Sequence, residues 1–465
     1  MPLILGANSV SGGYEIDNSL RFNSGSSDYL SKSFASNGNR QTWTWSAWIK
    51  ISKLTTTPAQ YLFTATDATT ATAGIYYSEY VGNTLTFENS AISLNLRASA
   101  NLFRDPSAWY HIVAVLDTTQ ATSTNRAKLY VNNTLITSYT SLSNYPTQNA
   151  NGTMNSTGFL HTLSSYNGTA EFFNGYMAET YFIDGQALTP SSFGETDEDT
   201  GIWKPKAYTG TYGTNGFYLQ FKNSASLGTD SSGNGNNFTV NNLTSIDQTT
   251  DTPTNNFATM NAVDNSSVTL SEGNLSASCA SPSGCRSTIG VTTGKWYVEV
   301  KYQNTTSMCG VVAMEQAVTS QAIGATIFGA SGTAPELFLN GSTPANYNSA
   351  TAFTANDIMQ IALDMDSNTV YFGLNGSWFD GTSWNSASPN TGHSLTTGYT
   401  YGVRASTGSG TSVNIWNFGN PPFTISSGNA DGNGLGNFEY AVPAGYYSLN
   451  TKNLAQYGWY DKQTN

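Results

Sequence analysis

The chain has 465 residues, a formal charge of −12 and only 10% charged residues. The acidic balance argues against nucleic acid and anionic membrane surfaces as partners. Aromatic residues make up 13% of the chain, which excludes a disordered protein. The length predicts two or three domains, each able to bury a core. We expect neither a signal peptide nor membrane insertion, because the start MPLILGANSV lacks a basic region and no long apolar run follows.

Residues 1–18 are predicted to form an N-terminal arm. The arm begins with the apolar residues Leu3, Ile4 and Leu5 and shows no sustained alternation afterwards. Apolar side chains near a chain end either dock on a partner or pack on the protein's own domain. Both interpretations stay open at this point.

Residues 19–195 are predicted to form a first antiparallel β-sandwich. Trp43–Ile51 alternates apolar and polar side chains, with Trp48 on the polar face. Trp109–Leu116 is apolar on both faces, as expected of a strand covered on both sides. Asn132 and Asn133 are typical of the tight turn of a two-residue hairpin. Short strands with turn residues between them favour an all-β domain.

Residues 196–255 are predicted to form a connector that packs on the domains, because it is rich in aromatic side chains. Within it, Asp230, Ser232 and Asn234 carry oxygen atoms at the alternating spacing of a calcium loop. The terminal bidentate Glu of such a loop is missing. A tight Asx turn explains the same residues, so the turn is favoured over calcium, and no other cofactor is predicted.

Residues 256–450 are predicted to form a second sandwich, followed by a C-terminal tail over 451–465. Met359–Met365 alternates with a period of two, and Asp366–Asn368 breaks the run with turn residues. Asn375 and Gly376 then supply a hairpin turn. The predicted fold class is therefore all-β: two jelly-roll-like antiparallel β-sandwiches in tandem, joined by a packed connector.

The loop after this hairpin is the predicted ligand-binding site. Trp378, Asp380, Trp384 and Asn385 place aromatic faces beside carboxylate and amide groups, the combination that binds sugars. The alternative is that the two tryptophans cover the end of the sandwich or contact a neighbouring subunit.

Catalytic motifs are weak. Glycan hydrolases of β-sandwich folds need two carboxylates on one strand face. Glu15–Leu20 and Glu195–Thr200 come near the motif of such hydrolases, which ends in a second Glu. The first stretch has Leu20 at that position and the second has Thr200. His111, His161 and His393 are not spaced as zinc ligands, and His111 is predicted to be a core or edge residue of its strand. We therefore expect a protein that is not an enzyme, with no catalytic residues.

The three cysteines are Cys279, Cys285 and Cys309, too few for a disulfide framework. Two states are compatible with the sequence: a local Cys279–Cys285 disulfide, or three free thiols in a protein assembled in a reducing cytoplasm. The free thiols are favoured.

Two stretches resemble known domains. WSAWIK, WYHIVAVLD, KLYVNNTLI and FFNGYMAETYFIDGQALTPSSFGE follow in the order typical of laminin-G-like, concanavalin A-like lectin domains. One departure is Asn133, which stands where these domains usually have Gly. GKWYVEV, YFGLNG and VNIWNFGNPPF are similar to the corresponding segments of SPRY domains. The resemblances imply a lectin-like module followed by a recognition module.

The chain as a whole resembles virion proteins of marine tailed phages of the cyanophage type, through segments such as SLRFNSGSSDYLSKSF and DSSGNGNNFTVNNL. This resemblance implies a tail-fibre, head-fibre or decoration protein on the virion surface, assembled in the host cytoplasm among other virion proteins. Three functions stay open: an appendage that binds host-surface polysaccharide, a purely structural decoration, and a polysaccharide depolymerase. A homo-oligomer such as a trimer stays open too. The sequence shows no heptads or β-helix repeats that would enforce one.

Overall fold

The computed structural model describes residues 13–54, 58–67, 72–78, 84–99, 103–141, 143–303, 307–318, 323–329, 335–342, 345–346, 352–407 and 410–458. Leu3, Ile4 and Leu5 of the predicted docking arm lie outside these ranges. The chain forms two compact units, which we call the N-terminal sandwich (Val10–Thr254) and the C-terminal sandwich (from Asn255). The all-β fold class is confirmed: the only α-helix in the described ranges is α1 (Thr451–Tyr457). Within those ranges, no helix has the length and apolar character of a membrane span.

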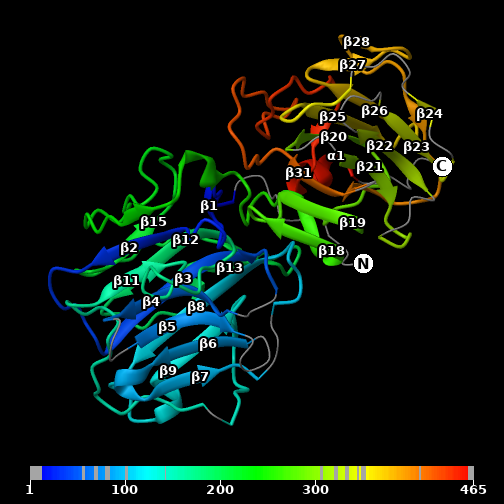
Figure 1. Ribbon diagram of the computed structural model, residues 1–465. Helices are drawn as coiled ribbons and strands as arrows, with labels where there is room; N and C mark the ends of the chain where they lie inside the picture. The colour runs from blue at the N-terminus through cyan, green and yellow to red at the C-terminus, as the bar shows by residue number, and fades with distance from the viewer. Residues whose placement is uncertain are drawn as a thin grey trace. The chain divides into compact units, whose positions relative to one another are not determined.

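The N-terminal sandwich has two main antiparallel sheets. Sheet A has the order β10-β9-β8-β3-β12-β1-β17, with β15 added beside β12. Sheet B has the order β16-β2-β11-β4-β5-β6-β7, and Figure 1 shows β4 to β7 side by side. β13 (Gly194–Thr196) and β14 (Trp203–Pro205) pair with each other as a separate two-stranded antiparallel ribbon. The strands of sheet A are β1 (Ser19–Phe22), β3 (Thr42–Ile51), β8 (Trp109–Asp117), β9 (Ala127–Val131), β10 (Thr134–Leu135), β12 (Gly175–Asp184), β15 (Phe217–Leu219) and β17 (Gln248–Thr249); those of sheet B are β2 (Tyr29–Ser33), β4 (Gln60–Thr66), β5 (Thr72–Ser78), β6 (Thr84–Asn89), β7 (Leu94–Arg97), β11 (Leu160–Leu163) and β16 (Thr239–Asn241).

The core of this sandwich lies between the inner faces of sheets A and B. Alternation along β3 turns Trp43 and Trp45 inward, and both are fully buried. The ring of Trp45 stacks on Phe63 of β4, with ring centroids 6.1 Å apart. Trp48 lies on the opposite face, as predicted, and packs there with Ile16. The period of two therefore places the aromatic residues as the sequence indicates.

Residues 196–255, which the sequence predicts as a connector, add strands to the N-terminal sandwich itself. β15 pairs with β12, β16 with β2, and β17 with β1. Both sheets are thus completed by a segment far from their other strands in sequence. The pairings follow from tertiary packing, because strands of two or three residues carry too little periodicity to be recognised.

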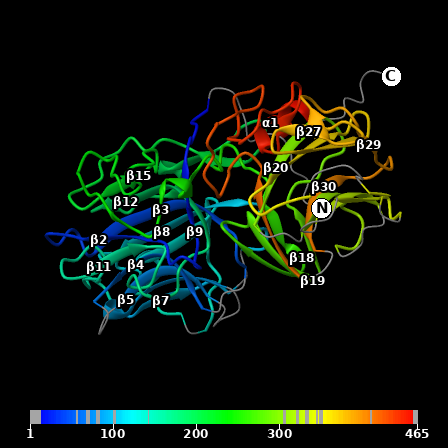
Figure 2. The same cartoon turned by 45° about the horizontal axis from the view of Figure 1, so that its top comes forward.

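The C-terminal sandwich is built on one 15-stranded sheet that encloses a single main core. Figures 1 and 2 both show the long hairpin of β18 and β19. The sheet order is β24 (Ala345–Asn346), β23 (Glu336–Leu339), β22 (Gly324–Gly329), β21 (Ser307–Ala313), β30 (Tyr401–Ser406), β19 (Ser276–Ser287), β31 (Thr411–Asn417), β20 (Lys295–Tyr302), β25 (Ile358–Asp364), β26 (Thr369–Leu374), β27 (Ser377–Phe379) and β28 (Trp384–Ser386); β18 (Met260–Ser271) pairs with β19, β29 (His393–Ser394) with β26, and β32 (Tyr447–Ser448) with β20.

The predicted hairpins are confirmed. Asn132 and Asn133 have φ of 46° and 66° between β9 and β10. Asn375 and Gly376 have φ of 48° and 87° between β26 and β27. Two consecutive residues of positive φ are the signature of the primed turn that matches the strand twist.

Candidate functional site

One row of side chains crosses the face of sheet B that points away from the core. Tyr61 on β4 pairs with Tyr76 on β5, Tyr76 pairs with Thr86 on β6, and Thr86 pairs with Arg97 on β7. Their chain neighbours, such as Ile75, belong to the main core, so alternation turns this row to the other side. The row gathers aromatic and polar groups from four consecutive strands.

The tyrosines form the floor of this site. The rings of Tyr61 and Tyr76 stack with centroids 4.5 Å apart, and Tyr166 packs against Tyr61 at 5.4 Å. Gly74 makes room for the stack, because a Cβ there would lie 3.0 Å from the Tyr61 ring. Tyr61 and Tyr76 are 6% and 8% exposed, whereas Tyr166 is half-buried.

Two carboxylates lie beside the tyrosine stack. Tyr76 Oη donates a 3.0 Å hydrogen bond to Glu88 on the neighbouring strand. Burial raises the pKa of Glu88, and the Tyr76 hydrogen bond and the charge of Arg97 oppose that rise. Burial and the nearby Glu88 carboxylate raise the pKa of Glu171. Glu88, Glu171 and Arg97 are half-buried, so they remain within reach of a ligand.

We call Tyr61, Tyr76, Tyr166, Glu88, Glu171 and Arg97 the tyrosine–glutamate face. A hydroxyl-rich ligand would find hydrogen-bond acceptors on the carboxylates, donors on Arg97 and an aromatic ring in the half-buried Tyr166. No sequence motif marks these residues. The sequence could have indicated them only through the alternation in GIYYS and TFENS, which places Tyr76 and Glu88 on the side of the sheet opposite to the core residues.

The predicted ligand loop is split by the structure. Trp378 is 2% exposed and packs with Tyr297 and Phe438. Its ring therefore offers no open face for stacking. Trp378 and Phe379 are consecutive on β27 and point to opposite faces, so one joins a satellite cluster and the other borders the main core.

Trp384, Asp380 and Asn385 remain together in the β27–β28 hairpin. The half-buried ring of Trp384 packs edge-on against Phe379, with centroids 5.5 Å apart. Asp380 Oδ1 accepts hydrogen bonds from Thr382 N and Ser383 N, each at 2.8 Å, which closes an Asx turn. Asn385 is exposed. This part of the predicted site keeps one aromatic ring beside polar groups.

The predicted calcium residues Asp230, Ser232 and Asn234 form a hydrogen-bonded turn. Asp230 Oδ1 accepts from Tyr218 N and Ser232 N, both at 2.9 Å. Asp230 Oδ2 accepts from Ser232 Oγ at 2.8 Å and Asn236 N at 2.7 Å. Asn234 directs its amide nitrogen to backbone carbonyls. In the described ranges, no three His, Cys, Asp or Glu side chains group as metal ligands would.

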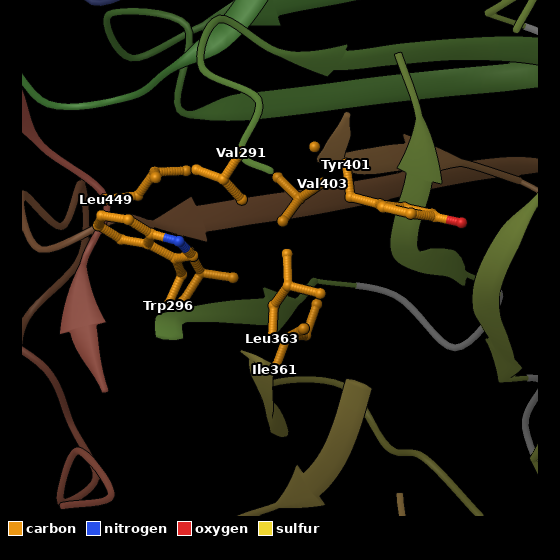
Figure 3. A pocket seen from close by; sticks show the side chains of 9 residues that line it. Val291, Trp296, Ile361, Leu363, Tyr401, Val403 and Leu449 are labelled. Atoms are coloured by element: carbon orange, nitrogen blue, oxygen red, sulfur yellow. The ribbon is translucent and has the colours of Figure 1, made fainter. Parts of the chain in front are cut away.

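A small cavity lies in the core of the C-terminal sandwich (Figure 3). Its volume of about 10 Å³ is close to the room that one water needs. The polar atoms on its walls bond elsewhere: Trp296 Nε1 donates to Thr293 O, and the Tyr401 hydroxyl points away and donates to Thr396 O. The cavity is a packing gap. It is lined by Val291, Trp296, Val298, Ile361, Leu363, Tyr401, Gly402, Val403 and Leu449.

His111 is a fully buried residue of β8, as predicted. Its ring stacks on Trp48, its Nδ1 accepts from Trp203 Nε1 at 3.0 Å, and its Nε2 lies 2.8 Å from Ser46 Oγ. Burial lowers the pKa of His111 to about 3. A neutral histidine wedged between tryptophans has a packing role.

Comparison with known proteins finds one family model that matches part of the chain. Residues 24–192 match the model of Laminin_G_3, described as the concanavalin A-like lectin/glucanases superfamily. The match lies within the N-terminal sandwich and includes all six residues of the tyrosine–glutamate face. It confirms the predicted lectin-like resemblance of this region. No curated protein matches the chain.

Several solved structures are similar to parts of the chain. The SPRY domain of human HERC1 shares 15% identity, covering 33% of this chain and 94% of that domain with a TM-score of 0.25. A SAP-like pentraxin from Limulus polyphemus shares 16% identity over 38% of this chain and 80% of its own, with a TM-score of 0.28. Domain 4 of an arabinanase from Geobacillus stearothermophilus, solved with arabinotriose, shares 18% identity over 34% and 66%, with a TM-score of 0.25.

Proposed function

We propose that this protein binds a glycan through the tyrosine–glutamate face and does so without cutting it. One observation carries the proposal: stacked tyrosines and flanking carboxylates meet on one sheet face within the region that matches the lectin family. Sugars bind where aromatic surfaces adjoin fixed hydrogen-bonding groups. The half-buried Glu88, Glu171, Arg97 and Tyr166 would make the polar contacts.

The biological setting that we propose is the surface of a phage particle, with the glycan on the host envelope. The similarity of the sequence to phage virion proteins supports this setting. The acidic surface suits it as well, since a net charge of −12 favours neutral or cationic sugars over nucleic acid. Imaging of particles carrying a labelled copy of the protein would test the location.

A binding experiment tests the face directly. The full chain should bind a subset of a glycan array or a host-envelope fraction. Tyr76→Phe removes the hydroxyl bonded to Glu88 and keeps the ring, and we expect this variant and Glu88→Gln to bind about tenfold more weakly, because each loses a hydrogen bond to a charged group. Trp384→Ala, in the other candidate loop, is the matched variant and should bind normally.

If Trp384→Ala abolishes binding while Tyr76→Phe leaves it intact, the β27–β28 hairpin is the binding site and the assignment to sheet B is wrong. If the native protein binds no glycan and no envelope fraction, the proposed function is wrong. The alternative of a purely structural decoration protein then remains.

A second candidate function rests on the two carboxyl groups of the same face. The charge of Glu88 helps raise the pKa of Glu171, and a carboxyl of raised pKa beside a second carboxyl is the pairing that general acid–base hydrolysis uses. A depolymerase would release reducing ends from host polysaccharide, and Glu88→Gln and Glu171→Gln would each abolish that release. Absence of new reducing ends with the native protein supports binding alone.

A further inference from the structure

Lys50 and Asp251 form an ion pair that is closed off from water. Lys50 lies on β3, and Asp251 follows β17, 201 residues later. Lys50 Nζ is 2.8 Å from Asp251 Oδ2, and the two side chains are 1% and 0% exposed. Two charges in such a place carry a large desolvation penalty unless their geometry compensates for it. A reaction that removes both charges would therefore be favoured here.

The surroundings orient the carboxyl group. Trp109 Nε1 donates a 3.1 Å hydrogen bond to Asp251 Oδ1, the oxygen that does not face the lysine. Ser19 Oγ donates a 2.6 Å hydrogen bond to the backbone carbonyl of Asp251. The ring of Tyr176 lies 5.5 Å from Lys50 Nζ. Each oxygen of the carboxyl thus has a distinct neighbour, and aromatic side chains border the pair.

We propose that Lys50 and Asp251 condense to an intramolecular isopeptide bond. A proton first moves from the ammonium to Oδ2 along the hydrogen bond that joins them, which gives a neutral amine and a neutral carboxylic acid. Nζ then bonds to Cγ, and the Cγ–Oδ2 bond breaks. Oδ2 leaves as water with two of the three protons that Nζ carried, and Nζ keeps the third. No oxidant or further reactant is required.

Three features of the site favour this reaction. Exclusion of water makes the two charges costly to keep here, so a reaction that consumes both is favoured. Contact between Nζ and the carboxyl makes the step intramolecular, which replaces the entropy cost of a collision. The Trp109 N–H points at Oδ1, where negative charge develops when Nζ adds.

The bond would fasten the last segment of the N-terminal sandwich to its sheet. Asp251 lies just beyond β17, an edge strand of two residues. The described cysteines are all free, so this bond would supply a covalent tie that disulfides do not. A cross-link between β3 and residue 251 would hold the sandwich closed under force or heat. This inference is independent of the proposed glycan binding.

Other lysine–aspartate pairs in the chain serve as controls. Lys204 Nζ lies 3.0 Å from Asp197 Oδ2, and Lys295 Nζ lies 2.9 Å from Asp364 Oδ2. Their lysine side chains are 30% and 40% exposed, so water stabilises both charges. These pairs should remain ionic.

Mass spectrometry of the full-length protein tests the proposal. We expect the intact mass to be one water lower than the sequence mass, and a protease digest to contain a branched peptide that joins Lys50 to Asp251. Lys50→Arg and Asp251→Ala should restore the full mass, whereas Lys204→Arg should still show the loss of one water. Digestion of the native protein gives an answer even if the Lys50 or Asp251 variants do not fold.

Separate linear peptides containing Lys50 and Asp251, in a protein of full mass, would overturn the proposal. A loss of water that persists in Lys50→Arg would overturn it as well, because it would belong to another site.

Discussion

The Tyr14 hydroxyl donates a 2.7 Å hydrogen bond to the Glu179 carboxylate, 165 residues further along the chain. Tyr218 Oη donates to the same carboxylate at 2.6 Å, and Tyr181 Oη donates to it as well. Glu179 has φ of 50° and lies where the pairing of β12 with β3 shifts register. The bulge brings this carboxylate to the outer face of sheet A, where it binds residues from three separate segments.

We expect Glu179→Ala to lower the free energy of unfolding of the N-terminal sandwich by about 3 kcal/mol, because tyrosine hydroxyls lose their acceptor in a buried place. Tyr14→Phe removes one donor and should cost about 1 kcal/mol. Urea denaturation followed by limited proteolysis measures both changes and assigns them to this unit. Equal, small effects of the two variants would show that the carboxylate does not organise the cluster.

The buried histidines should make the N-terminal sandwich sensitive to acid. Burial lowers the pKa of His111 and of His161 to about 3, against about 6.5 in the unfolded chain. Between these values the unfolded state binds a proton that the folded state does not. Each histidine therefore contributes stability that is complete above pH 6.5 and is lost as the pH falls toward 3, by about 2 kcal/mol from pH 7 to pH 5.

His111→Asn isolates one of these contributions. The variant is expected to be less stable than the native protein at pH 7, since it loses the tryptophan stacking. Its stability should nevertheless fall by about 2 kcal/mol less between pH 7 and pH 5. Urea titrations at the two pH values measure this difference. Parallel losses in both proteins would mean that His111 is protonated in the folded state.

The Asp230 turn should be independent of calcium. Four hydrogen bonds from the chain already reach the Asp230 carboxylate. We therefore expect EDTA to leave the melting temperature unchanged, whereas Asp230→Ala should cost about 2 kcal/mol by leaving backbone N–H groups unpaired. A melting temperature that drops with EDTA and recovers with added calcium would establish a structural ion instead.

The cysteines should be unreactive in the folded protein. Cys279, Cys285 and Cys309 are free and buried. Burial raises the pKa of Cys279 to about 11 and that of Cys309 to about 12, so little of the reactive thiolate forms at neutral pH. A thiol reagent should label none of them before denaturation and all three afterwards. Labelling of a single cysteine in the denatured, unreduced protein would reveal a Cys279–Cys285 disulfide.

Tertiary packing also decides which of the residues predicted from the sequence to bind a ligand are buried. Trp378 and Trp384 are both tryptophans of the predicted ligand-binding loop. The structure nevertheless buries Trp378 and leaves Trp384 half-buried. Tyr61, Tyr76 and Glu88 carry no motif, and they become neighbours only when β4, β5 and β6 pair in one register. A shift of one residue would turn each of them into the core.

The sequence by itself determined the all-β class, the inward side of strands such as β3, and the hairpins at Asn132–Asn133 and Asn375–Gly376. These features depend on alternation and turn chemistry within a few residues, so they can be recognised locally. Only the tertiary structure decided that residues 196–255 complete both sheets of the N-terminal sandwich and that Lys50 meets Asp251. Such contacts join segments far apart in the chain, and they are fixed by strand order and by the burial of polar groups that must find partners.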